Sequence, residues 1–243
     1  CIAASITMYL LCFRRGELSL RHRPGRFRPT RRVLGKALHI SLPMGLQQGI
    51  MCSAYVATTL IIAPLGTFAI AANSFGIIIE SLCYMPGYGI ADAATTLVGQ
   101  SLGAARHELM KRFAWLSVLL GMAVMAVMGV VMYVGAPFAM SLMTPVSEVR
   151  SLGAGILRIE AFAEPMFAAA IVSYAGIVGA AQTLVPSLMN LASMWGVRIT
   201  LAALLAPTMG LRGVWLAMCI ELCFRGFIFL VRLRFWRSGR SKG

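Results

Sequence analysis

The stretch that decides the fold of this chain is PGYGIADAATTLVGQSLG, residues 86–103. It closes a long apolar segment that starts near Thr67, and it is rich in Gly, Ala, Ser and Thr. In lipid, small residues let helix backbones approach closely, and dispersion and hydrogen bonds then hold the helices together. Arg106 follows after two alanines, so charge begins where the apolar segment ends. We therefore expect a membrane helix that packs inside a bundle and ends at a charged membrane face.

The composition points to the same class of protein. Of the 243 residues, 59% are hydrophobic and 12% are charged, and the mean hydropathy is +0.80. A soluble domain carries about 25% charged residues. The sequence therefore predicts an all-α, polytopic membrane helix bundle. The net charge of +14 comes from clustered basic residues, so it bears on orientation in the membrane and not on nucleic acid.

Four regions follow along the chain. Residues 1–13 look like the end of a truncated transmembrane helix, because a dozen apolar residues are too few to span a bilayer; a lipidated Cys1 is the alternative. Residues 14–36 form a basic linker broken by prolines, for which a cytoplasmic loop is favoured over a nucleic-acid arm. Residues 37–234 form a six-helix carboxy-terminal lobe, and residues 235–243 a basic cytoplasmic tail.

Six full spans are expected in this lobe. They cover residues 37–63, 67–101 with a kink near Pro86, 113–134, 148–176 with an interruption at Pro165, 184–206 and 211–233. The linker, the loop at residues 106–112 and the carboxy-terminal end from Arg232 onward hold seventeen of the twenty-two basic residues, whereas the loops at 64–66, 135–147 and 207–210 hold none. The positive-inside rule then predicts that both ends lie in the cytoplasm.

Eight charged residues fall inside the expected spans at more than two residues from either end. They are Glu80, Asp92, Arg158, Glu160, Glu164, Arg198, Glu221 and Arg225. A charge at a helix centre is expensive in lipid, so each needs a partner or water. Glu221 and Arg225, four residues apart, suit a structural ion pair, and Arg198 also calls for a carboxylate partner.

Glu164 is the main candidate for ion coupling. It lies beside Pro165 near the middle of a span, and a carboxylate at a helix break is typical of a cation or proton site. Glu160 lies four residues earlier on the same face, and Glu80 is a further candidate. Asp92, nearer a membrane face, is a candidate as well, with simple hydration as the alternative. The amides of Gln47 and Gln48 suit either contact with substrate or hydrogen bonds between helices.

No catalytic or metal-binding motif accompanies these residues. The sequence has no HExxH, GxSxG or phosphate-binding glycine loop, and its three His and six Cys show no metal spacing. Cys219 and Cys223 share a helix face, where apolar filling is favoured over a thiol pair. We expect no enzyme activity, no metal and no cofactor apart from a coupling ion, H⁺ or Na⁺.

The order of motifs resembles the carboxy-terminal half of the MATE (multidrug and toxic compound extrusion) family over essentially the whole chain. The matching pieces are Pro86-Gly87, ATTLVGQSLGA at residues 94–104, Leu157-Arg158-Ile159, Glu164-Pro165, Trp195-Gly196-Val197-Arg198-Ile199 and Gly213-Val214-Trp215-Leu216-Ala217. The basic linker looks like the loop that joins the two lobes of such proteins.

The resemblance implies a parent protein with twelve helices in two pseudo-symmetric lobes. Such a protein would lie in the plasma membrane, the inner membrane of a bacterium, and would export cationic or amphipathic drugs or metabolites in exchange for H⁺ or Na⁺. The partners would be a small-molecule substrate, the bilayer and the missing amino-terminal lobe, with no nucleic acid.

The sequence departs from the family pattern at two places, and the second bears on the ion. The turn that usually resembles LRGAGDT reads IVGAAQT here, at residues 177–183, without the Arg and the Asp. Met51 stands where several sodium-coupled members carry a Glu, which puts sodium coupling through that position in doubt. A lipid-linked oligosaccharide flippase of the same superfamily is one alternative function, and an intramembrane enzyme is an alternative of another class. The acidic balance of the charges within the spans favours a cationic cargo over a pyrophosphate.

Overall fold

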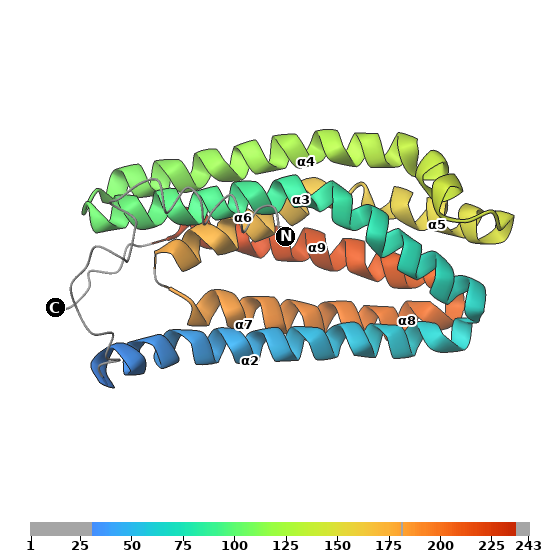
Figure 1. Ribbon diagram of the computed structural model, residues 1–243, viewed down its shortest axis with the longest axis horizontal. Helices are drawn as coiled ribbons and strands as arrows, with labels where there is room; N and C mark the ends of the chain where they lie inside the picture. Colours follow the sequence, from blue (N-terminus) through green and yellow to red (C-terminus); the bar gives the residue numbers. More distant parts are fainter. Residues whose placement is uncertain (1–30, 181, 237–243) are drawn as a thin grey trace, which may run out of the picture. The chain divides into compact units, whose positions relative to one another are not determined.

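The computed structural model describes residues 31–180 and 182–236, which form helices joined by short turns (Figure 1). The chain divides into two units, residues 1–40 and 41–243. Of the first unit only residues 31–40 are described, as the beginning of helix α2. The expectations for residues 1–13, for most of the basic linker and for the end of the tail lie outside the described residues.

The elements follow one another without a strand in the described ranges. They are α2 (Arg31–Ile62), a 3₁₀ turn η2 (Ala63–Leu65), α3 (Thr67–Gly103), α4 (His107–Met143), α5 (Ser147–Glu160), α6 (Glu164–Gly179), α7 (Leu184–Ser193), a π turn η3 (Met194–Ile199), α8 (Thr200–Met209) and α9 (Leu211–Arg234). Five helices are long and apolar enough to cross a membrane, and there are six candidate spans if α5 and α6 count as one. The predicted polytopic helix bundle is confirmed.

Helix α4 is longer than the sequence predicted. We expected a loop from residue 135, but the helix continues through Pro137 to Met143. A proline inside a helix removes one N–H and frees the carbonyl four residues earlier. That carbonyl belongs to Tyr133, and the Nε of Arg158 donates to it at 3.5 Å. The hydrogen bond from α5 thus compensates the break, and α4 continues.

The fourth span is broken where the sequence predicted it. Helix α5 ends at Glu160, α6 begins at Glu164, and their axes differ by 57°. Pro165 occupies the first turn of α6, where a missing N–H costs nothing because that group has no partner within the helix. The interruption therefore lies before Pro165.

The fifth span contains a feature that the sequence analysis did not anticipate. Between α7 and α8 the residues Met194–Ile199 form a π turn, which holds Arg198. Such turns insert one extra residue into a helix and are frequent at functional sites. The helix also continues past Pro207 to Met209 and ends at Gly210, whose φ of 60° a glycine adopts without strain.

The small residues of the opening stretch face the interior of the bundle. Gly87, Ala91, Ala94, Val98 and Ser101 are all buried, and their spacing of four and three residues places them on one face of α3. This face packs against α4 and α6, and α3 and α4 run side by side (Figure 1).

The contact between α3 and α6 is closest near the end of α6. A Cβ on Gly179 would lie 2.6 Å from the carbonyl oxygen of Thr95, so only glycine fits there. The hydroxyl of Thr95 donates to the carbonyl of Ala175 at 3.1 Å, in addition to one in its own helix. Close backbone approach and a hydrogen bond between helices are the two forces that hold membrane helices together.

Helix α9 is held by similar contacts. A Cβ on Gly226 would collide with the backbone carbonyl of Met166 on α6. On α3, Gly76 lies under the ring of Trp215, and the indole N–H of Trp215 donates to Asn73 at 3.0 Å. Helices α3, α6 and α9 therefore form the frame that positions the polar residues described below.

Gly226→Ala tests this frame. The added Cβ forces α6 and α9 apart, and we expect a loss of about 1–3 kcal/mol, the usual cost of overpacking. Gly135→Ala on α4 is the matched control, because its Cβ meets open space. The midpoint of thermal unfolding of the purified full-length protein measures both. Equal midpoints for Gly226→Ala and the unmodified protein would contradict the close contact.

Candidate functional site

Six charged side chains gather in the interior of the unit formed by residues 41–243. They are Glu80 on α3, Glu160 at the end of α5, Glu164 at the start of α6, Arg198 on the π turn, and Glu221 and Arg225 on α9. Each is at most 8% exposed. We refer to these six residues as the carboxylate cluster.

Glu160 and Glu164 border the break between α5 and α6. The N–H of Ala163 donates to the carbonyl of Glu160 at 2.8 Å, which fixes the turn between them. Neither carboxyl oxygen of Glu164 has a hydrogen-bond partner among the described residues, and neither does one oxygen of Glu160. An ionised carboxylate buried without a partner is very costly. Glu164 therefore has the properties of a group that binds a proton or a cation.

A glycine on α4 brings the break close to its neighbour. A Cβ on Gly129 would lie 2.7 Å from the carbonyl oxygen of Ala161 and 3.3 Å from the Cβ of Glu164. The missing side chain thus lets the turn between α5 and α6 rest against α4. The sequence analysis did not assign Gly129 a role, because a lone glycine within an apolar helix gives no signal of its partner.

Glu221 is the best-compensated acid of the cluster. The hydroxyl of Ser193 donates to its Oε1 at 2.6 Å, and the Nε of Arg225 lies 3.2 Å from the same oxygen. Arg225 also lies over the ring of Phe167, with 5.8 Å between the guanidinium carbon and the ring centroid. Glu221 and Arg225 therefore form an ion pair within one helix, at the spacing of four residues.

Arg198 differs from its expected role. It forms no ion pair with a described residue; its Nη1 and Nη2 instead lie 3.8 Å and 2.7 Å from the sulfurs of Met194 and Met218. Its guanidinium carbon is 5.7 Å from the ring centroid of Tyr55, and its Nε has no partner. The π turn and the two methionines hold the guanidinium, and this leaves the cation without a bonded carboxylate.

Electrostatic interactions nevertheless join the members of the cluster. Glu160 interacts with Glu80, Glu164, Glu221 and Arg198, and Glu80 also interacts with Arg198 and Glu164. Four carboxyl groups face two guanidinium groups. If all four were ionised, two negative charges would lack a counter-charge in a dry environment, so the cluster favours the uptake of protons or a cation.

Aromatic rings lie next to the cluster. Tyr84 and Tyr88 on α3 and Phe167 on α6 pack edge to face, with centroids 5.4–6.4 Å apart. Tyr84 also interacts electrostatically with Glu80, Glu164 and Tyr55. Tyr88 and Tyr55 are about half exposed, at 45% and 51%. Sequence reasoning missed these rings, although the spacing of Glu80, Tyr84 and Tyr88, four residues each, places all three on one face of α3.

Three of the candidate residues for ion coupling or substrate contact lie apart from the cluster. Asp92 is exposed on α3. Gln47 accepts a hydrogen bond from the hydroxyl of Tyr174 at 3.1 Å, which joins α2 to α6. Gln48 is exposed, and its amide lies 3.9 Å from the sulfur of Cys52 in its own helix. In the described part of the chain no three His, Cys, Asp or Glu residues converge as metal ligands do.

Comparison with known proteins shows which family this chain resembles in sequence. A profile of the MatE family matches residues 43–204. The probable multidrug resistance protein NorM of Idiomarina loihiensis is 27% identical over 86% of this chain and 46% of the relative. The protein of the same name from Brucella suis is 28% identical over 96% of this chain and 52% of the relative. The chain thus spans about half the length of these relatives.

Solved structures share the fold. A MATE structure in the straight conformation matches 96% of this chain and 54% of that chain, with a TM-score of 0.83 and 17% identity. The Vibrio cholerae MATE transporter VcmN in the bent form matches 85% and 47%, with a TM-score of 0.79 and 17% identity. These names describe transporters and no enzyme. Because the family profile matches two thirds of this chain, the chain belongs to the MatE family of membrane transporters.

Proposed function

We propose that this chain is the carboxy-terminal lobe of a secondary antiporter. The whole protein exports cationic or amphipathic drugs or metabolites, and the energy comes from protons that move in the opposite direction. The observation that carries the proposal is Glu164, buried at a helix break with both carboxyl oxygens unpartnered. The amino-terminal lobe would supply the other side of the transport pathway, since the relatives are about twice as long.

The aromatic rings beside the cluster suit a cationic cargo. A cation over the face of Tyr or Phe is attracted by the ring, and the attraction grows when water is excluded. Tyr84 and Tyr88 provide such faces, and both rings interact electrostatically with Glu80. Cargo would bind to the rings, and its charge would replace the proton that neutralises the carboxylates.

Arg198 would act as a tethered counter-charge in this exchange. It interacts with Glu80 and Glu160 without bonding to either of them. When protons leave the cluster, a small movement of the π turn would bring the guanidinium to a carboxylate. Replacing the contacts of Arg198 with the methionine sulfurs by a contact with a carboxylate would cost little, because the methionine side chains are flexible.

The exposed face of α3 offers a path toward the second lobe. Gly89, Ala93, Thr96 and Gln100 recur at a spacing of three and four residues and lie partly or fully open to the surroundings. Small and polar residues of this kind are typical of interfaces between membrane helices and of water-filled cavities. We place the substrate pathway along this face.

The proton is favoured over sodium as the coupling ion. Among the described residues no three His, Cys, Asp or Glu side chains are grouped to hold a metal ion, and Met51 occupies the place of a glutamate that several sodium-coupled members of the family carry. Sodium exchange is the second candidate, because four acids share the cluster. A flippase for a pyrophosphate-linked lipid is less suited to the carboxylate cluster, which holds more acidic than basic groups. No motif supports an intramembrane enzyme.

Glu164→Gln tests the coupling. The substitution keeps the shape of the side chain and removes its titration, so we expect the full-length transporter to bind an organic cation but to lose efflux driven by a pH gradient. Efflux of a fluorescent cation from proteoliposomes measures this. Glu148→Gln is the matched control, since Glu148 is exposed in the first turn of α5.

Normal pH-driven efflux by Glu164→Gln, at equal protein level, would assign Glu164 a packing role and move coupling to Glu80. Efflux that follows a sodium gradient and ignores the pH gradient would establish the sodium alternative.

We also propose that the protein lies in the bacterial inner membrane with both ends of this lobe in the cytoplasm. The turn between α3 and α4 contains Arg106 and is followed by Lys111 and Arg112, whereas residues 144–146 between α4 and α5 carry no basic residue and only Arg150 follows near the start of α5. Excess basic charge marks the cytoplasmic side.

Single-cysteine variants test this orientation. In a full-length protein without other cysteines, Ser147→Cys should react with an impermeant maleimide in intact cells, and Ala104→Cys should react only after the cells are opened. Both positions are exposed at opposite ends of α4. The reverse pattern of labelling would overturn the orientation.

A further inference from the structure

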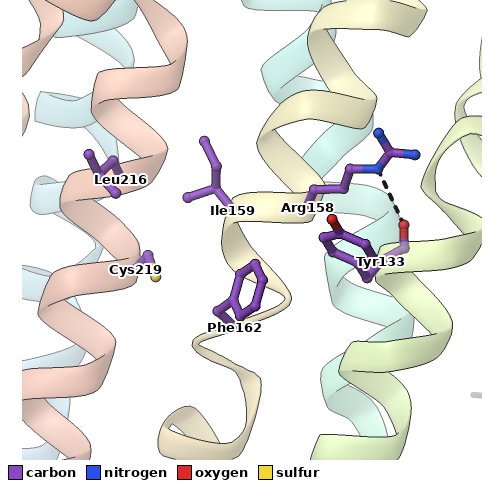
Figure 2. A pocket seen from close by; sticks show the side chains of 6 residues that line it. All are labelled: Tyr133, Arg158, Ile159, Phe162, Leu216 and Cys219. Carbon is purple, nitrogen blue, oxygen red and sulfur yellow. Dashed lines mark hydrogen bonds between the residues drawn. The ribbon is translucent and has the colours of Figure 1, made fainter.

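A second site lies on the outer surface of the helices, apart from the carboxylate cluster. A cavity of about 330 Å³ opens between α4, α5 and α9. Its lining consists of Tyr133, Arg158, Ile159, Phe162, Leu216 and Cys219, and we refer to it as the Arg158 groove. Figure 2 shows Leu216 and Cys219 opposite Ile159 and Phe162, while Arg158 extends toward Tyr133.

Arg158 is the only charged residue of this lining, and it lacks an acidic partner. Its Nε donates to the carbonyl of Tyr133 at 3.5 Å, and its guanidinium carbon lies 5.5 Å from the centroid of the Tyr133 ring. No described carboxylate forms an ion pair with it, and the side chain is exposed. These contacts anchor the arginine, and no hydrogen bond joins its two Nη groups to a described residue, so both are open to an external acceptor. Charged residues in spans normally face the bundle interior, so the exposure requires an explanation.

The depth of Arg158 suits a lipid headgroup. Helix α4 has 37 residues and is therefore about 55 Å long. The hydrocarbon core of a bilayer is about 30 Å thick, so α4 extends about 12 Å beyond the core at each end if the excess is shared equally. Helix α5 starts at Ser147, beside the end of α4. Arg158 lies eleven residues further on, so its Cα is about 16 Å along α5 from that end. It is then about 4 Å inside the hydrocarbon edge, a distance that an arginine side chain bridges to reach phosphates.

The surroundings of the groove are those of a lipid-facing surface. On α4 the side chains of Val130, Val131, Val134 and Phe138 are each more than half exposed. Large apolar groups suit acyl chains, whereas the exposed Gly89, Ala93 and Thr96 in the second half of α3 are small residues of the kind found where membrane helices pack against each other. Phe162, 72% exposed, extends this apolar surface into the groove.

We propose that the Arg158 groove binds an anionic phospholipid. The phosphate accepts hydrogen bonds from the guanidinium of Arg158, and an acyl chain lies over Ile159, Phe162 and Leu216. Tyr133 orients the arginine through its ring and its freed carbonyl. Since Phe162 belongs to the turn between α5 and α6, the lipid contacts the break that holds Glu160 and Glu164 from its outer side.

Quenching of a tryptophan by brominated lipid tests the proposal. Phe162→Trp places a reporter in the groove of the full-length transporter, reconstituted in phosphatidylcholine vesicles. A small fraction of either brominated phosphatidylglycerol or brominated phosphatidylcholine is then added, and the quenching of the protein with Phe162 is subtracted. We expect about fivefold enrichment of the anionic lipid, the effect of one basic residue near a membrane surface.

Further variants distinguish the source of this enrichment. Arg158→Gln in the reporter protein should abolish it, Arg158→Lys should retain most of it because the charge remains, and Arg150→Gln, also on α5, should leave it unchanged. Equal quenching by the two lipids, or enrichment that persists in Arg158→Gln, would overturn the proposal. Absence of quenching by both lipids would also overturn it, because the second lobe or another protein would then cover the groove.

Discussion

The close approach of α3 and α6 is the contact on which the rest of the structure depends. Gly179 lies against the backbone of Thr95, and the hydroxyl of Thr95 bonds to a carbonyl of α6. Water contributes nothing to helix association in lipid, so such contacts must supply the stability themselves. Nearer the start of α6, Tyr84 packs against Phe167, and Gly87 lies against Ile171. The first turn of α6, which carries Glu164, is thereby kept in the interior next to the helix that carries Glu80.

This frame lets the protein hold more acid than base in its interior. Glu221 is neutralised by Arg225 and Ser193, whereas Arg198 is held by sulfur and an aromatic ring and stays unbonded to an acid. Glu160 and Glu164 therefore need protons or a bound cation to neutralise their charge. A structural role alone would be better served by apolar residues of the same volume, since buried charges are costly to keep. The imbalance is the feature on which the proposed exchange of one positive charge for another rests.

The sequence predicted the elements and the location of the break, because apolar length, Gly and Pro act locally. The small face of α3 and the interruption before Pro165 are examples. It did not predict that α4 continues through Pro137, since the compensating bond comes from Arg158 on another helix. The sequence also did not predict the partners of the buried charges. Arg198 was expected to pair with a carboxylate, but a π turn places it against Met194 and Met218. Contacts between distant helices decide such details, and one sequence does not encode them in a readable pattern.

The most direct test of the central claim is to count protons while a cation binds. Tetraphenylphosphonium is added to the purified full-length transporter in weakly buffered solution near neutral pH, and the pH change is recorded together with the heat of binding. Binding should release protons, because the cation replaces those that neutralise the cluster, and Glu164→Gln should bind the cation with less release. Cation binding that releases no protons from the unmodified protein would contradict the account.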